Sequence, residues 1–178
     1  PFEIFEQFFG GASPFRTARM PRYGITIDFM EAIEGVEKQV ELEGKKRKFK
    51  IPAGVDDGSR MRFDDFILSI NVRPHKIFER DGADIYIRLT IPFSLATLGG
   101  QIEVPTVDGE VKLKVRPGTQ SGTMMRLRGK GAPSLRGRGP LRREASRGDQ
   151  YVRLQVAVPE KLNRDQKKIV EEIRKEGL

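Results

Sequence analysis

Short stretches of alternating apolar and polar residues recur along the chain, as in β-strands with one buried face. Residues 23–29 and 36–42 alternate in this way. The stretches "FMEAIEG" (29–35) and "FSLATLG" (93–99) are long enough only for a helical turn that ends at glycine. The pattern therefore predicts a mostly-β fold with short helices.

Two segments predict β-hairpins. "LEGKKRKFKI" (42–51) has a turn signal at Glu43-Gly44, and "PTVDGEVKLKV" (105–115) has one at Asp108-Gly109. The sequence "FDDF" (63–66) is a poor two-residue hairpin, because neither central position is Gly or Asn. Either a loop has been shortened at this point, or residues are missing between Phe63 and Phe66.

Residues 162–178 follow a helical period instead. Asn163 can cap this helix, and its apolar residues form a stripe on an otherwise charged surface. The members of the stripe are Leu162, Ile169, Val170 and Ile173. The stripe could pack on its own domain or meet a second copy of the chain.

The chain repeats itself. Three pairs of segments align: residues 25–35 with 89–99, 50–63 with 114–127, and 65–72 with 149–156. Two homologous units therefore follow one another. We expect two tandem β-sandwich-like domains with short helices and a C-terminal helix.

The spacing between the repeats grows by twenty positions, from 64 (50 to 114) to 84 (65 to 149), and the additional residues form an arginine-rich run. Residues 126–147 carry eight basic residues and one acidic residue, Glu144, within a chain of net charge +8. The run contains no aromatic residue to stack on bases. A solvated loop is therefore favoured over a nucleic-acid site, which stays open as the alternative.

The amino-acid composition argues against several kinds of metal and catalytic site. The chain has no cysteine and a single histidine, His75, so thiolate metal sites, disulfides and histidine zinc sites are not expected. The sequence contains no phosphate-binding loop motif. The adjacent acidic residues Asp56-Asp57 and Asp64-Asp65 predict turns rather than catalytic carboxylates. We expect no enzyme activity, no cofactor, no metal, no membrane span and a reducing, cytoplasmic location.

A family resemblance covers most of residues 21–160. The residues that carry it are "IPAGVDDGSRMRF", "NVRPHKIFERDGADIYIRLTI", "LGGQIEVPTVDGEVKLKV", "PGTQSGTMMRLRGKGAPSLRGRG" and "GDQYVRLQV". Together they resemble the C-terminal substrate-binding region of DnaJ co-chaperones. His75 is not followed by Pro-Asp, so the family's J-domain signature is absent, as are its Cys-x-x-Cys-x-Gly zinc repeats.

The resemblance implies four segments. Residues 1–20 resemble the end of the family's Gly/Phe-rich linker, 21–79 a first, client-binding β domain, 80–162 a second β domain, and 163–178 a dimerisation helix. It implies a non-enzymatic homodimer that captures hydrophobic segments of unfolded or partly folded polypeptides for a DnaK-type chaperone. The rival is a basic protein that binds nucleic acid through residues 126–147.

The resemblance also implies a client groove in the first unit. Its residues are Tyr23, Ile25, Val40, Leu42 and Phe78, and core packing is the alternative role for each. Lys38 matches a position that contacts the partner chaperone's acidic tail in some members, but Glu41 stands where another lysine would be. The groove positions of the second unit lack the aromatics, which favours the first unit.

Overall fold

The computed structural model describes residues 20–42, 44–134 and 147–177. The predicted linker (1–20, apart from Met20), the turn residue Glu43 and most of the arginine-rich run, residues 135–146, therefore lie outside the described residues. The first unit contains one short helix and five strands. Their bounds are β1 (Arg22–Ile27), α2 (Phe29–Glu34), β2 (Val36–Leu42), β3 (Lys45–Ile51), β4 (Arg60–Arg62) and β5 (Ile67–Val72).

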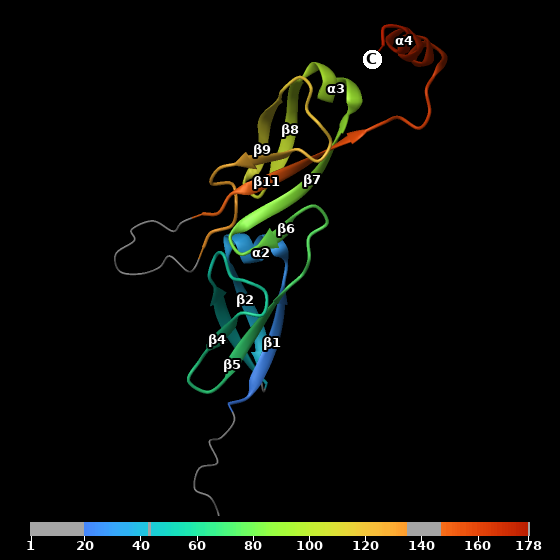
Figure 1. Cartoon of the computed structure of the whole chain (residues 1–178). Helices are drawn as coiled ribbons and strands as arrows, with labels where there is room; N and C mark the ends of the chain where they lie inside the picture. Colours follow the sequence, from blue (N-terminus) through green and yellow to red (C-terminus); the bar gives the residue numbers. More distant parts are fainter. Residues whose placement is uncertain (1–19, 43, 135–146, 178) are drawn as a thin grey trace, which may run out of the picture.

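The second unit repeats this order. After one additional strand, β6 (Glu79–Asp81), come β7 (Asp84–Pro92), α3 (Phe93–Leu98), β8 (Gly100–Thr106), β9 (Gly109–Val115), β10 (Met124–Leu127) and β11 (Gln150–Ala157). The C-terminal helix α4 (Arg164–Lys175) follows. The mostly-β fold with short helices is confirmed, and the units lie end to end in Figure 1. The domain boundaries at residues 79 and 162 stay predictions.

Each unit is built from a sheet and a hairpin. In the first, the sheet order is β1-β5-β4, with β1 parallel to β5, and β2 pairs with β3 as a separate hairpin. In the second, the order is β10-β11-β7-β6, with β7 parallel to β11, and β8 pairs with β9. The sheet and the hairpin pack their apolar faces on one another, which gives each unit two layers.

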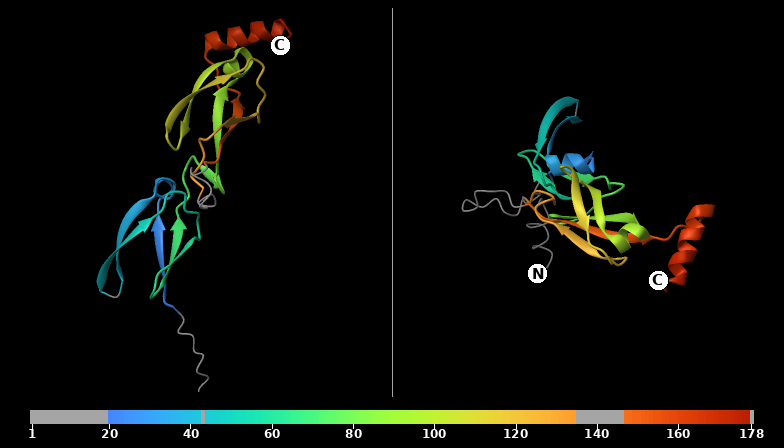
Figure 2. Two further views of the ribbon diagram at one scale, coloured as in Figure 1. Left: turned by 90° about the vertical axis from the view of Figure 1, so that its left-hand side faces the viewer. Right: turned by 90° about the horizontal axis from the view of Figure 1, so that it is seen from above.

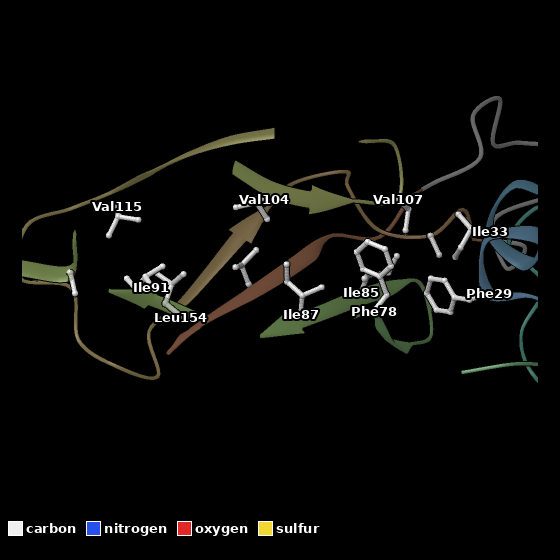
Figure 3. Close-up of a cluster of buried hydrophobic side chains, with 13 residues drawn as sticks. Phe29, Ile33, Phe78, Ile85, Ile87, Ile91, Val104, Val107, Val115 and Leu154 are labelled. Carbon is white, nitrogen blue, oxygen red and sulfur yellow. The ribbon is translucent and has the colours of Figure 1, made fainter. Parts of the chain in front are cut away.

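The two hydrophobic cores differ in extent. The buried residues of the first all come from the first unit, among them Ile27, Ile51 and Leu68. The second core is not confined to the second unit, because Phe29 and Ile33 of α2 belong to it (Figure 3). Apolar packing therefore continues across the junction between the two units.

Two turns differ from the sequence predictions. The second hairpin closes at Val107-Asp108 rather than Asp108-Gly109, because Thr106 pairs with Gly109 and its hydroxyl donates to the Gly109 carbonyl at 2.6 Å. The "FDDF" segment closes a two-residue turn, in which the Phe63 N–H donates to the Phe66 carbonyl at 2.9 Å. The rings of Phe63 and Phe66 stack at 4.7 Å, so aromatic packing supports this turn.

The segment between the units forms a regular hairpin. Strand β6 pairs antiparallel with the start of β7, with Glu79 opposite Tyr86 and Asp81 opposite Asp84. Residues 79–92 thus form a hairpin within the sheet of the second unit.

Candidate functional site

Strand β1 offers an open edge to a further strand. The carbonyls of Pro21 and Ile27 accept hydrogen bonds from Ile67 and Arg73, both at 2.9 Å, so the odd-numbered residues of β1 face β5. In a parallel pair alternate residues point the other way. The backbone groups of Gly24 and Thr26 therefore face the opposite edge, where no strand among the described residues pairs with β1.

Three of the five predicted groove residues lie together. Ile25 is 9% exposed within the first core, and the half-buried side chains of Tyr23 and Val40 pack against the same core. The Tyr23 ring meets Phe66 edge-on, with 5.6 Å between ring centroids. Sheet and hairpin thus contribute neighbouring, partly accessible apolar side chains.

The other two predicted groove residues are not joined to these. The backbone of Leu42 pairs with Lys45 at the end of the hairpin, but its side chain lies outside the described residues. Phe78 belongs to the second core, where its ring stacks on Phe29 at 5.9 Å and on His75 at 4.8 Å. The structure therefore does not bring Phe78 to the Tyr23 side of the unit, because the docking of the two units draws it to the junction.

The equivalent surface of the second unit is more closed. Ile87 and Val104 occupy the positions of Tyr23 and Val40 in the repeat and are 2% and 0% exposed. Leu89, at the position of Ile25, is half-buried. Two of the three positions are thus more accessible in the first unit.

Charged groups beside the first-unit surface are already paired. Lys38 forms an ion pair with Glu31 of α2, and this hydrogen bond, with that of the Asp28 N–H, lowers the pKa of the Glu31 carboxyl. Arg47 of β3 forms a bidentate pair with Asp65, at 2.8 and 3.2 Å, and this lowers the pKa of Asp65. An acidic ligand at Lys38 would therefore have to displace Glu31.

The C-terminal helix exposes its apolar stripe. The Asn163 side chain accepts from the Gln166 N–H at 2.8 Å and the Gln166 side chain accepts from the Asn163 N–H, which confirms the predicted cap. No residue of α4 is buried, and Ile169 is 57% exposed. Leu162 and Val170 are also exposed, and Ile173 is half-buried. Figure 2 shows the helix apart from the sheets of the second unit.

The described ends of the arginine-rich run are anchored on the second unit. Arg147 donates to both carboxylate oxygens of Asp108, at 2.9 and 3.1 Å, and Lys130 lies 3.4 Å from the same carboxylate. Burial opposes ionisation of Asp108, but Arg147 and Lys130 outweigh it and lower the pKa of its carboxyl. Arg126 lies 3.7 Å from Asp149. These three basic residues are paired within the chain, which favours the loop interpretation over a phosphate-binding face.

Residues at the junction were missed by the sequence analysis. The Arg80 side chain is 13% exposed and donates to the carbonyls of Gly54 and Val55 and to Asp56. Its burial lowers the pKa of the guanidinium, against the opposing charge of Asp56. The signal for this role was weak, because an arginine between acidic residues and a glycine is typical of an exposed turn.

Two other features are absent from the part of the chain that the structure describes. There, no cluster of three or more His, Cys, Asp or Glu residues is placed to hold a metal ion. No helix in the same ranges is long and apolar enough to cross a membrane.

Comparisons with known proteins agree with this architecture. Residues 22–159 match the model of the DnaJ C terminal domain family. A "Chaperone protein DnaJ" of Pediococcus pentosaceus is 46% identical over 141 residues, covering 72% of this chain and 36% of the relative. That of Clostridioides difficile is 43% identical over 164 residues, covering 82% of this chain and 41% of the relative. The chain thus spans about two-fifths of the length of these relatives, and it belongs to the DnaJ C-terminal domain family.

Proposed function

We propose that this chain binds exposed apolar segments of unfolded or partly folded polypeptides and delivers them to a DnaK-type chaperone. The observation that carries the proposal is the combination, in the first unit, of an open β1 edge with the half-buried side chains of Tyr23 and Val40, which pack against the core that contains Ile25. Family membership and relatives named "Chaperone protein DnaJ" support it. The absence of cysteine supports a cytoplasmic location for this activity.

The proposed mechanism is strand addition. A client segment in extended conformation hydrogen-bonds to Gly24 and Thr26, while its alternate side chains contact the apolar surface. Gly24 suits this role, because a glycine within a strand allows close approach of another backbone. If Gly24 carried a Cβ, the nearest atom to that Cβ would belong to the Asn71 side chain, at 3.8 Å. Binding of this kind needs no chemical step, so the proposal includes no enzyme activity.

The proposed contact with the partner chaperone is conditional. Lys38 could contact the acidic tail of a DnaK-type chaperone only if that tail replaces Glu31, its present ion-pair partner. The exchange gains little, because one carboxylate replaces another at a half-exposed lysine. Tail binding through Lys38 is therefore proposed as a weak interaction.

We propose that α4 forms a homodimer contact. Support comes from two further apolar residues exposed at the same end of the second unit, Leu98 at 76% and Val158 at 79%. Together with the stripe on α4, they form apolar surface for which a second copy is a fitting cover. A dimer would present two client surfaces and raise avidity for clients with several apolar segments.

The test of client binding compares two identical substitutions. Val40 in β2 and Val111 in β9 are both half-buried on homologous hairpins. Val40→Ser should weaken binding of a fluorescent, permanently unfolded polypeptide about five-fold, since it removes apolar contact area. Val111→Ser should change it less than two-fold. Equal losses for both variants, with circular dichroism unchanged, would refute the first-unit site.

A further inference from the structure

A cavity of about 680 Å³ lies at the junction of the two units. Its walls come from α2, the loop after β3, the segment that follows β5, and β6 with its turn. We call it the junction pocket. It is separate from the Tyr23 surface, because none of Tyr23, Ile25 and Val40 lines it.

Three rings form an apolar wall of the junction pocket. The rings of Phe29, His75 and Phe78 form one cluster in which Phe78 stacks on His75 at 4.8 Å and on Phe29 at 5.9 Å. The centroids of Phe29 and His75 are 5.5 Å apart. Figure 3 shows Phe29 and Phe78 side by side at the end of the second core. The imidazole Nδ1 of His75 accepts the backbone N–H groups of Ile77 and Phe78, at 3.1 and 3.2 Å. The wall is therefore held in place before any ligand arrives.

Both arginines that line the junction pocket are already compensated. Arg80 pairs with Asp56 at 2.6 Å, and three further N–H groups donate to backbone carbonyls. Arg73 pairs with Asp28 at 3.1 Å. Each guanidinium thus has a carboxylate partner within the chain.

The carboxylates of the junction pocket are less fully compensated. Asp57 accepts the Val72 N–H at 2.7 Å and has no ion pair among the described residues. Asp81 likewise has none within that part of the chain, and Glu79 shares an exposed contact with Arg88 at 3.2 Å. The pocket thus joins an apolar wall to an excess of negative charge.

We propose that the junction pocket binds a segment of a non-native polypeptide in which an apolar side chain stands next to arginine or lysine. The apolar side chain packs on the ring wall, and the cation reaches Asp57 or Asp81. Charge complementarity selects the cationic segment, since a carboxylate beside Asp57 and Asp81 would be repelled. This inference rests on the proposed function and deepens it, because it adds a second, charge-selective contact for clients.

The test uses three labelled peptides that share a central Leu-Phe pair and differ in their flanking residues, which are Arg, Gln or Glu. Binding to the full chain is followed by fluorescence anisotropy and by the imidazole proton signals of His75, the single histidine of the chain. The Arg-flanked peptide should shift these signals and bind about five-fold more tightly than the Glu-flanked peptide. The preference should shrink as salt is raised.

The matched variants are Asp57→Asn with Asp81→Asn, and, as control, Asp64→Asn with Glu110→Gln on other surfaces. The amide introduced by Asp57→Asn keeps an oxygen that can accept the Val72 N–H. The first variant should lose the preference for Arg flanks and the His75 shift, whereas the control should keep both.

Two results would contradict the inference in distinguishable ways. If Arg- and Glu-flanked peptides bind alike while Val40→Ser still weakens unfolded clients, the junction pocket assignment fails and the proposed function stands. If neither the peptides nor unfolded clients bind the starting chain, the proposed function fails and the inference fails with it.

Discussion

Val40 and Val104 occupy equivalent positions on the two homologous hairpins, yet Val40 is half-buried and Val104 has no exposed surface. The same residue therefore faces a partly open surface in one unit and a closed core in the other. A substitution at Val40 should therefore affect mainly client binding, and one at Val104 mainly the stability of the fold. The same difference excludes Val104→Ser as a control for binding, since that substitution would affect folding.

Val104→Ser should lower the free energy of unfolding by about 2–4 kcal/mol, because it creates a cavity and buries a hydroxyl. Val40→Ser should lower it by about 1 kcal/mol or less. Urea unfolding followed by circular dichroism measures both variants against the starting chain. Equal destabilisation would show that Val40 is as much a core residue as Val104.

The packing of the two units predicts a specific sensitivity at Gly54. A Cβ on Gly54 would lie 2.1 Å from the Pro133 carbonyl oxygen, at a backbone φ of +83°. Gly54→Ala should therefore lower the free energy of unfolding by about 3 kcal/mol, from both clash and strain. Gly58→Ala is the control, because φ is +72° there but nothing lies within 4 Å. Its cost should be about 1 kcal/mol, and similar costs at both positions would contradict the close contact.

The Asp108 cluster predicts a pH dependence. The pKa of Asp108 is lowered in the folded chain, so its contribution to stability is complete above the unfolded pKa, about 3.9, and is lost as pH falls through the lower, folded value. Because the pair with Arg147 is partly exposed, we expect a contribution of about 1 kcal/mol. Unfolding by urea between pH 7 and pH 2 should show a smaller loss for Asp108→Asn than for the starting chain. An unchanged pH profile would show that the cluster adds no stability.

The exposed stripe on α4 predicts a change of oligomeric state. Ile169→Glu with Ile173→Glu would place two charges in the proposed dimer contact, so the starting chain should be a dimer and the variant a folded monomer by light scattering. Lys168→Gln with Lys175→Gln changes the net charge by the same amount on the face of α4 opposite the stripe and should stay dimeric. A starting chain that is monomeric at high concentration would refute the dimer.

Local patterns predicted most of the fold. Strand alternation around Ile25 and Ile27, the repeat of the two units and the cap at Asn163 each depend on residues close in sequence or on the comparison of equivalent segments. The "FDDF" turn has a poor local sequence, and its support comes from stacked rings and from Arg47, which is distant in sequence. Turn propensity does not report such tertiary contacts.

The site was only partly predictable for the same reason. Alternation and resemblance predicted Tyr23, Ile25 and Val40 as groove residues, and the structure places these three in one core. Their role in binding stays a prediction. The position of Phe78 depends on how the two units dock, which no local pattern encodes. A sequence signal did exist for the open edge, namely Gly24 within an otherwise regular strand.

Amide hydrogen exchange tests the central claim most directly, because equivalent N–H groups of the two units can be compared within one chain. The N–H groups of Gly24 and Thr26 face the free edge of β1. Those of Arg88 and Thr90 take the same positions on β7, beyond the residues that pair with β6. They face away from β11, because the Ile85 N–H donates to the carbonyl of Asp149, just before β11. Saturating the chain with an apolar, Gln-flanked peptide should slow exchange at Gly24 and Thr26 at least ten-fold, which corresponds to about 1.4 kcal/mol of added protection. Exchange at Arg88 and Thr90 should not change. Protection at Arg88 and Thr90 instead, or at neither pair while the peptide is bound, would contradict client binding by strand addition to the first unit.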